Sequence, residues 1–111
     1  GGPMMGLSQP TAESPVIKGA SGILALTGKD AYIAESSPCI RCAKCVSSCP
    51  VQLMPTTIAQ AAEHELFDWA EKLHALDCFE CGCCSYVCPS KIPLTQWIRV
   101  AKAEIMNRKK K

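Results

Sequence analysis

The stretch CIRCAKCVSSCP, residues 39–50, places four cysteines at the spacing C-x2-C-x2-C-x3-C and ends in proline. The stretch CFECGCCSYVCP, residues 78–89, repeats the spacing and the final proline. Together these two runs hold all nine cysteines of the 111-residue chain, and eight of the nine stand at the repeated spacing. So many cysteines in a short chain indicate either a metal protein or a disulfide scaffold.

The spacing is typical of the runs that bind 4Fe–4S clusters in bacterial ferredoxins. Three thiolates separated by two residues can curl around three corners of one cubane, and in two-cluster proteins the fourth cysteine of each run crosses over to the other cluster. The prediction is therefore two 4Fe–4S clusters. The ligands expected for the first cluster are Cys39, Cys42, Cys45 and Cys88, and those for the second are Cys78, Cys81, Cys84 and Cys49.

Two other interpretations of the cysteines are weaker. Zinc ribbons usually separate two C-x2-C pairs by a longer loop, whereas three cysteines here fall between residues 39 and 45. Disulfides need a secreted context, and we recognise no signal peptide. A structural zinc module remains as the remote alternative.

Length and charge narrow the function further. The chain is long enough for one domain, and a domain this small usually needs additional stabilisation, such as bound metal. Each cluster with its thiolates adds −2, which turns the formal charge of +2 into about −2. Nucleic acid is therefore not an expected partner.

No apolar run reaches the length of a membrane span. No catalytic constellation is visible either, and for that reason the chain is not expected to have an active site of its own.

The pattern between and after the runs predicts helices. A first helix of about twenty residues should begin at Pro55 or be capped by Thr57, with an apolar stripe at helical spacing. That stripe consists of Ile58, Ala62, Leu66, Trp69, Leu73 and Leu76. A second helix should open near Pro93, with a stripe of Leu94, Trp97, Ile98, Ala101 and Ile105.

These elements predict a mainly α fold of the α-helical ferredoxin type, in which two clusters lie between loop–helix–loop–helix elements. Residues 38–107 would form this domain. Residues 1–37, rich in glycine and proline, would form an extended arm with room for short strands at 16–26, and residues 108–111 a basic tail.

Several single residues have ordinary interpretations. Cys83 breaks the spacing and is expected to be a packed free thiol, with a ligand exchange with Cys84 as the minor alternative. The histidines, His64 and His74, are expected at the surface. Both tryptophans, Trp69 and Trp97, are expected in the core because they lie on the apolar stripes.

Charges near the runs predict an order of reduction. The first run contains Arg41 and Lys44, whereas the second contains Glu80 and follows Asp77. Reduction adds negative charge to a cluster, so nearby cations favour it. On this basis the first cluster is expected to have the higher potential.

The chain also resembles the C-terminal ferredoxin part of the C subunit of the Rnf electron-transport complex. The resemblance is carried by PCIRCAKCVSSCP followed by LMP, by DCFECGCCSYVCPSKIPLTQWIRVAKAEI, and by the earlier segments GGPMMG and PVIKGASGILAL. It implies a membrane-bound, ion-translocating ferredoxin:NAD⁺ oxidoreductase, in which the C subunit is peripheral on the cytoplasmic side of the inner or plasma membrane.

What the resemblance implies for this chain is a relay of single electrons through the eight cluster cysteines. Its expected partners are other subunits of the membrane complex and an NADH- and flavin-binding domain upstream. The alternative is a freestanding soluble ferredoxin with two 4Fe–4S clusters, or a ferredoxin subunit of another oxidoreductase.

Overall fold

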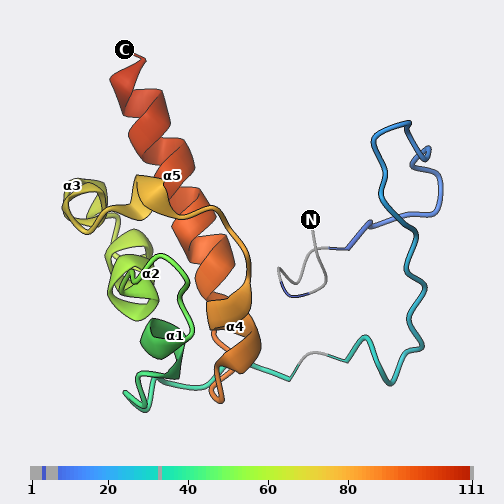
Figure 1. The fold of residues 1–111 in the computed structure, drawn as a ribbon, viewed down its shortest axis with the longest axis horizontal. Coiled ribbons are helices and arrows are strands. Elements are labelled where there is room, and N and C mark those ends of the chain that lie inside the picture. Colours follow the sequence, from blue (N-terminus) through green and yellow to red (C-terminus); the bar gives the residue numbers. More distant parts are fainter. Residues whose placement is uncertain (1–3, 5–7, 33, 111) are drawn as a thin grey trace.

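A helical domain and a separate arm make up the computed structural model, which describes residues 4, 8–32 and 34–110 (Figure 1). The fold is mainly α, as predicted, and no strand occurs among the described residues. The elements are α1 (Lys44–Ser47), α2 (Pro55–Glu63), α3 (Phe67–Lys72), the 3₁₀ helix η2 (Ala75–Asp77), α4 (Cys83–Val87) and α5 (Leu94–Lys109).

The domain is built from two similar halves. The short helices α1 and α4 begin at Lys44 and Cys83, and the longer helices α2 and α5 begin at Pro55 and Leu94. Both pairs are 39 residues apart, which is also the offset between the two cysteine runs. The short helices inside the runs were not predicted, because four or five residues carry too little periodicity to show.

The apolar core lies where α2 packs against α5. Ile58 on α2 and Ile98 on α5 are almost completely buried, and the predicted stripe of α5 faces this core. Trp97 is half-buried and packs against the same core, as expected. The buried core residues are Leu53, Ile58, Ala61, Ala62, Ala70, Ala75, Ile98, Ala101 and Ile105.

The prediction of a single helix of about twenty residues after the first run is wrong. The helix ends at Glu63, and Glu65 adopts a left-handed backbone conformation with φ 59°. The Leu66 N–H donates to the carbonyl of Ala61 at 2.8 Å, and the Glu65 N–H donates to that of Ala62 at 3.1 Å. This pair of bonds is a Schellman ending. Because a glycine would normally mark such an ending, the break could not be predicted from the residues present.

The break lets α3 turn back against the C-terminal part of α5. The Arg108 guanidinium lies 5.0 Å from the centre of the Phe67 ring and bonds Asp68 at 3.3 Å, while Lys109 pairs with Glu71 at 2.6 Å. The residues expected to form a basic tail therefore begin as the last turn of α5. Trp69 on α3 is 53% exposed, so its assignment to the core is wrong.

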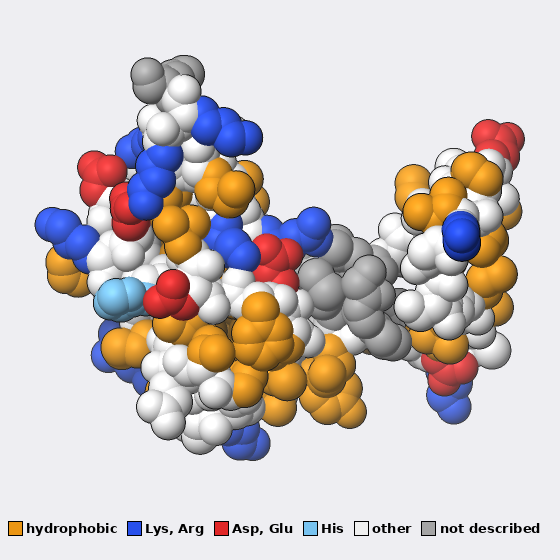
Figure 2. Space-filling view, turned by 45° about the horizontal axis from the view of Figure 1, so that its top comes forward, with side chains coloured by type: hydrophobic (Ala, Val, Ile, Leu, Met, Phe, Trp, Pro, Cys, Tyr) orange, Lys and Arg blue, Asp and Glu red, His pale blue; other side chains and the backbone are white. Residues whose placement is uncertain are grey.

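The arm adds nothing to this core. The short strands considered for residues 16–26 do not form, and the apolar side chains there stand exposed (Figure 2). The arm joins the domain beside the second run, where the Ser37 N–H donates to the Ser90 carbonyl at 2.9 Å and the Ser90 hydroxyl donates to that of Pro38 at 3.0 Å. None of the described helices is both long and apolar enough to cross a bilayer.

Replacing Glu65 by glycine should stabilise the protein. A left-handed conformation costs a non-glycine residue roughly 1–2 kcal/mol, part of which glycine returns through its freer unfolded chain. We expect a net gain of up to about 1 kcal/mol, seen as a higher midpoint of anaerobic thermal unfolding by circular dichroism.

The matched control is Glu63→Gly, two residues earlier in the last turn of α2. Here glycine should cost up to about 1 kcal/mol, the ordinary penalty within a helix. Equal losses from both variants would mean that the helix continues through Glu65 in solution.

Candidate functional site

Eight cysteines gather around two cavities in the helical domain. Each cavity receives three cysteines from one run and the fourth from the other. The first cavity is lined by Cys39, Cys42, Cys45 and Cys88, and the second by Cys78, Cys81, Cys84 and Cys49. These groups coincide with the two predicted ligand sets; that the thiols bind iron there stays a prediction.

The first cavity is the larger and more open. Its volume is about 190 Å³, and Cys42 at its edge is exposed. Ile40 and Met54, also exposed, add apolar surface beside Arg41. One flank of this cavity therefore meets solvent.

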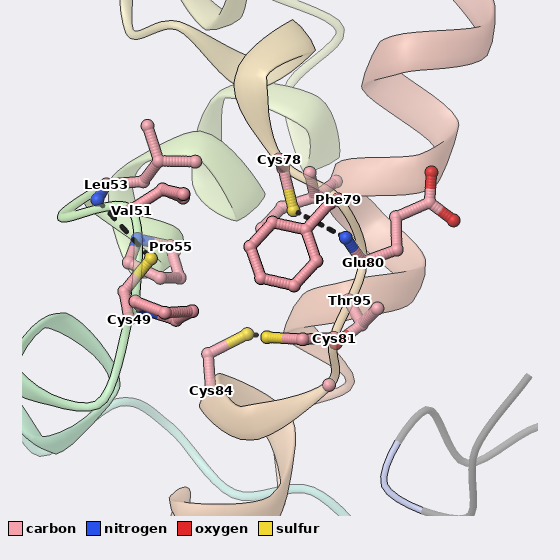
Figure 3. A pocket seen from close by; sticks show the side chains of 13 residues that line it. Cys49, Val51, Leu53, Pro55, Cys78, Phe79, Glu80, Cys81, Cys84 and Thr95 are labelled. Atoms are coloured by element: carbon pink, nitrogen blue, oxygen red, sulfur yellow. Dashed lines mark hydrogen bonds between the residues drawn. The ribbon is translucent and has the colours of Figure 1, made fainter.

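The second cavity is narrow and more enclosed by apolar side chains. Its volume is about 20 Å³, and Cys81 and Cys84 point toward one another across it (Figure 3). Leu53 and Ile98 belong to both its lining and the apolar core. This cavity is thus an extension of the packing between α2 and α5.

Left-handed residues bend each run so that its cysteines face a common space. In the first run Arg41 and Ala43 have φ 55° and 60°, and in the second Glu80 and Gly82 have φ 61° and 82°. These are equivalent positions of the two halves, and only one is glycine. Strain of this kind persists where the surroundings fix the backbone, and it is common at ligand-holding loops.

Backbone N–H groups point at cysteine sulfurs in both cavities. The N–H of Arg41 donates to Cys39 Sγ at 3.4 Å, and the N–H of Glu80 donates to Cys78 Sγ at the same distance. In the second cavity Cys49 Sγ also accepts the N–H of Leu53, at 3.4 Å. Such donors stabilise a thiolate over a thiol, which is the form that binds metal.

Burial works in the opposite direction on two of these thiols. Desolvation raises the pKa of Cys78 and of Cys84, and the hydrogen bonds they accept only partly offset it. Desolvation thus opposes the deprotonation of both thiols that metal binding requires.

The ninth cysteine, Cys83, is a half-buried free thiol that lines neither cavity. A side-chain hydrogen bond with Cys81 is the main cause of its raised pKa. Both histidines are exposed, as predicted, and His74 Nδ1 lies 3.3 Å from the Asp77 carboxylate.

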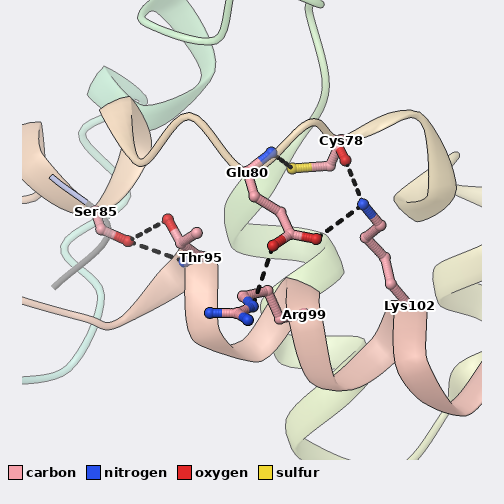
Figure 4. A network of polar contacts seen from close by, with 6 residues as sticks. All are labelled: Cys78, Glu80, Ser85, Thr95, Arg99 and Lys102. Atoms are coloured by element: carbon pink, nitrogen blue, oxygen red, sulfur yellow. Dashed lines mark hydrogen bonds and ion pairs between the residues drawn. The ribbon is translucent and has the colours of Figure 1, made fainter. Parts of the chain in front are cut away.

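A polar network ties the second run to α5 (Figure 4). Lys102 Nζ donates to the Cys78 carbonyl at 2.6 Å and to Glu80 Oε1 at 2.9 Å, while Arg99 Nε lies 3.1 Å from Glu80 Oε2. Two cations therefore flank Glu80, one of the two carboxylates that were expected to make the second cluster harder to reduce. Glu80 therefore no longer supports ranking the first cluster above the second; Arg41, Lys44 and Asp77 still do, and the order of reduction stays a prediction.

Sequence reasoning missed Arg99 and Lys102, as well as two hydroxyls that contact cysteine sulfurs, those of Thr56 and Thr95. The spacing of three between Arg99 and Lys102 puts both on one side of a helix. Which loop that side meets depends on how α5 packs, so the spacing alone could not identify the partner.

Replacing Lys102 by methionine should loosen the second run. The charged hydrogen bonds it removes are worth roughly 1–3 kcal/mol in a half-buried setting, so the cluster expected at Cys78 and Cys81 should be lost severalfold faster to an iron chelator. Cluster-resolved electron paramagnetic resonance (EPR) would follow the loss.

Lys109→Met is the matched control, because Lys109 also pairs with a glutamate but is 56% exposed against 19% for Lys102. It should leave the rate unchanged, since exposed pairs contribute little. Equal rates in both variants would show that the network does not hold the loop.

The donor set of each cavity fits a 4Fe–4S cluster. Such clusters take four thiolates on four different irons, so their ligands stand further apart than around one ion. Cys49 and Cys88 would complete the second and first sets from the opposite runs.

Comparison with known proteins agrees with these observations. Residues 38–92 match the family described as the 4Fe-4S dicluster domain. The whole chain is 50% identical to part of the C subunit of the Na(+)-translocating ferredoxin:NAD(+) oxidoreductase complex of Acetobacterium woodii, covering 25% of that protein. Over 94% of the chain it is 44% identical to the C subunit of the proton-translocating ferredoxin:NAD(+) oxidoreductase complex of Clostridium ljungdahlii, covering 23% of that protein.

A third relative is the C subunit of the ion-translocating oxidoreductase complex of Methanosarcina acetivorans, 43% identical over 97% of the chain and 24% of that protein. The chain thus spans about a quarter of the length of these relatives. Residues 38–92 belong to the 4Fe-4S dicluster domain family, which binds two 4Fe–4S clusters, and the chain as a whole is a homologue of part of the C subunit of the Rnf-type ion-translocating oxidoreductase complexes.

Proposed function

We propose that this domain passes electrons one at a time through two 4Fe–4S clusters, one in each cysteine-lined cavity. The first cluster would be held by Cys39, Cys42, Cys45 and Cys88, and the second by Cys78, Cys81, Cys84 and Cys49. The observation that carries the proposal is the exchange of the fourth cysteine between the two runs. This exchange supports the loop–helix–loop–helix arrangement of an α-helical ferredoxin.

The packing between the cavities supports transfer from one cluster to the other. Cys84 of the second set lies in the same buried apolar group as Cys45 and Cys88 of the first, together with Ala59 and Leu94. Ligands of both clusters therefore share one dry patch of core. Water excluded from this patch neither screens the clusters from each other nor has to reorganise when charge moves.

The protein and the clusters divide the work. When bound, the clusters supply the one-electron chemistry. The chain positions the eight thiols, covers them with apolar side chains such as Leu53 and Ile92, and directs N–H and hydroxyl groups at the sulfurs. Burial, hydrogen bonds and nearby charge are the means by which a protein sets cluster potentials.

The names of the relatives support a larger setting for this activity. Each belongs to an ion-translocating oxidoreductase complex, so we infer that the domain exchanges electrons with neighbouring subunits while peripheral to the cytoplasmic face of the membrane. The arm exposes apolar residues, among them Ile17, Ile23 and Leu24, and such a surface is expected to be buried against another part of the protein or a partner. An upstream NADH- and flavin-binding domain in the same polypeptide would bury this surface and would donate electrons to the clusters.

Metal analysis tests the proposal most directly. Anaerobically purified or reconstituted protein should contain about eight iron atoms and eight acid-labile sulfides per chain, the content of two 4Fe–4S clusters. Removing the iron should also unfold much of the domain, because ligands from distant parts of the chain share each cluster. Zinc without sulfide would instead identify a structural zinc module, and a well-folded metal-free form would contradict the coupling.

Serine variants of the two fourth cysteines test the ligand sets. Cys49→Ser should damage the cluster of the second run, and Cys88→Ser that of the first, because each thiol lines the opposite cavity. Cys49→Ser should therefore lose the same EPR signal as Cys78→Ser, and Cys88→Ser the same signal as Cys39→Ser.

Cys83→Ser is the matched control, since Cys83 lines neither cavity and should leave both signals in place. If Cys49→Ser and Cys39→Ser lost the same signal, each run would hold its own cluster and the exchange would be wrong.

A further inference from the structure

Each cavity has one threonine hydroxyl beside one cysteine sulfur. Thr56 Oγ1 lies 3.0 Å from Cys45 Sγ in the first cavity, and Thr95 Oγ1 lies 3.7 Å from Cys84 Sγ in the second. In both halves the threonine follows its cysteine by eleven residues, near the start of the helix after the run. The two contacts are equivalent positions of the repeat, yet their lengths differ.

Metal binding fixes the direction of these contacts. A cysteine bound to iron is a thiolate and has no hydrogen to donate, so the threonine hydroxyl must be the donor. Reduction adds negative charge to the cluster and its sulfurs, and a donated hydrogen bond stabilises the more negative state. Because Cys45 and Cys84 are both buried, the low local dielectric strengthens this effect.

The surroundings of the two hydroxyls are not the same. In the second half Ser85 Oγ lies 2.8 Å from Thr95 Oγ1 and accepts the Thr95 N–H at 2.9 Å. Either hydroxyl can donate in the contact between Ser85 and Thr95. When Thr95 is the donor, Ser85 competes with Cys84 for its single hydrogen. The equivalent position in the first half is Val46, whose side chain has no polar atom. Thr56 has no such competitor there.

Other hydrogen bonds to sulfur do not account for the difference between the two threonine contacts. The N–H groups of Arg41 and Glu80 contact their cysteines at 3.4 Å in both halves, so their effects are matched. The N–H of Leu53 contacts Cys49, but it is backbone and stays the same when a threonine is replaced. The effect of each hydroxyl can therefore be measured by itself.

We propose that Thr56 is a positioning residue that raises the reduction potential of the first cluster through its hydrogen bond to Cys45, and that Thr95 does the same for the second cluster only weakly because its hydroxyl lies farther from the sulfur and also contacts Ser85. The inference rests on the proposed ligand sets. It goes beyond them by assigning a tuning role to one side chain in each half.

The test is a redox titration of the intact two-cluster protein followed by EPR, with Thr56→Val as the main variant. Valine keeps the branched shape and removes only the hydroxyl, so the potential of the first cluster should fall while that of the second stays unchanged. Thr56→Ser keeps a hydroxyl and should restore the potential toward the wild-type value. Thr95→Val should lower the second potential by a smaller amount.

Three results would overturn the inference. Thr56→Val could leave the first potential unchanged, or Thr56→Val and Thr56→Ser could shift it equally, which would point to packing. Failure of both Thr56→Val and Thr56→Ala to assemble the first cluster, while Thr56→Ser assembles it, would show that the hydroxyl is needed for assembly and not for tuning.

The serine variants of Cys49 and Cys88 separate this inference from the proposed function. If they lose the expected clusters and Thr56→Val still leaves the potential unchanged, only the tuning role fails. If they lose the opposite clusters, the ligand sets fail and the tuning role fails with them.

Discussion

The exchange of one cysteine between the two runs is the constraint on which the rest of this structure depends. Cys49 can reach the second cavity, and Cys88 the first, only when the two runs lie side by side although they are 39 residues apart. The helix that follows each run must then pack against its counterpart. The core between α2 and α5, with Ile58 and Ile98 at its centre, is the result. Metal binding and core formation should therefore occur as one folding event.

The two halves share a backbone plan but differ in their polar surroundings. Left-handed residues occur at matching positions, and each half directs an N–H at its first cysteine. The second half adds Arg99 and Lys102 around Glu80, a serine beside its threonine, and a cavity enclosed by core residues. The first half keeps an open cavity with an exposed cysteine. A duplicated scaffold can in this way hold two clusters of one type at different potentials.

These differences suggest separate roles for the two cavities. The first is the more open and has Cys42, Ile40 and Met54 at the surface. The second lies against the packed interior of the domain. The arm joins the domain at Ser37 and Pro38, next to Ser90 in the lining of the first cavity. The arm therefore meets the helical domain beside the more open of the two cavities.

Much of this could be predicted from the sequence because ligand spacing and helical periodicity are local properties. The cysteine spacing predicted the cofactor, which the match to a dicluster family confirms, and the stripe of α5 predicted its buried face. The periodicity gave a wrong prediction where the helix after the first run ends, because no glycine or proline indicates that end. Glu65 adopts a conformation that usually needs glycine, so the end of the helix was missed and Trp69, expected in the core, lies exposed.

The sequence by itself determined the type of cofactor, the number of its sites and the mainly helical class, because each depends on residues close together in the chain. Only the tertiary structure decided the charge and hydrogen bonding around each site. Glu80 looked like an isolated negative charge until α5 brought Arg99 and Lys102 against it, and Thr56 and Thr95 looked like ordinary helix residues until their hydroxyls met cysteine sulfurs. Electrostatic surroundings depend on distance through space, and spacing along the chain fixes that distance only within a single helix or loop.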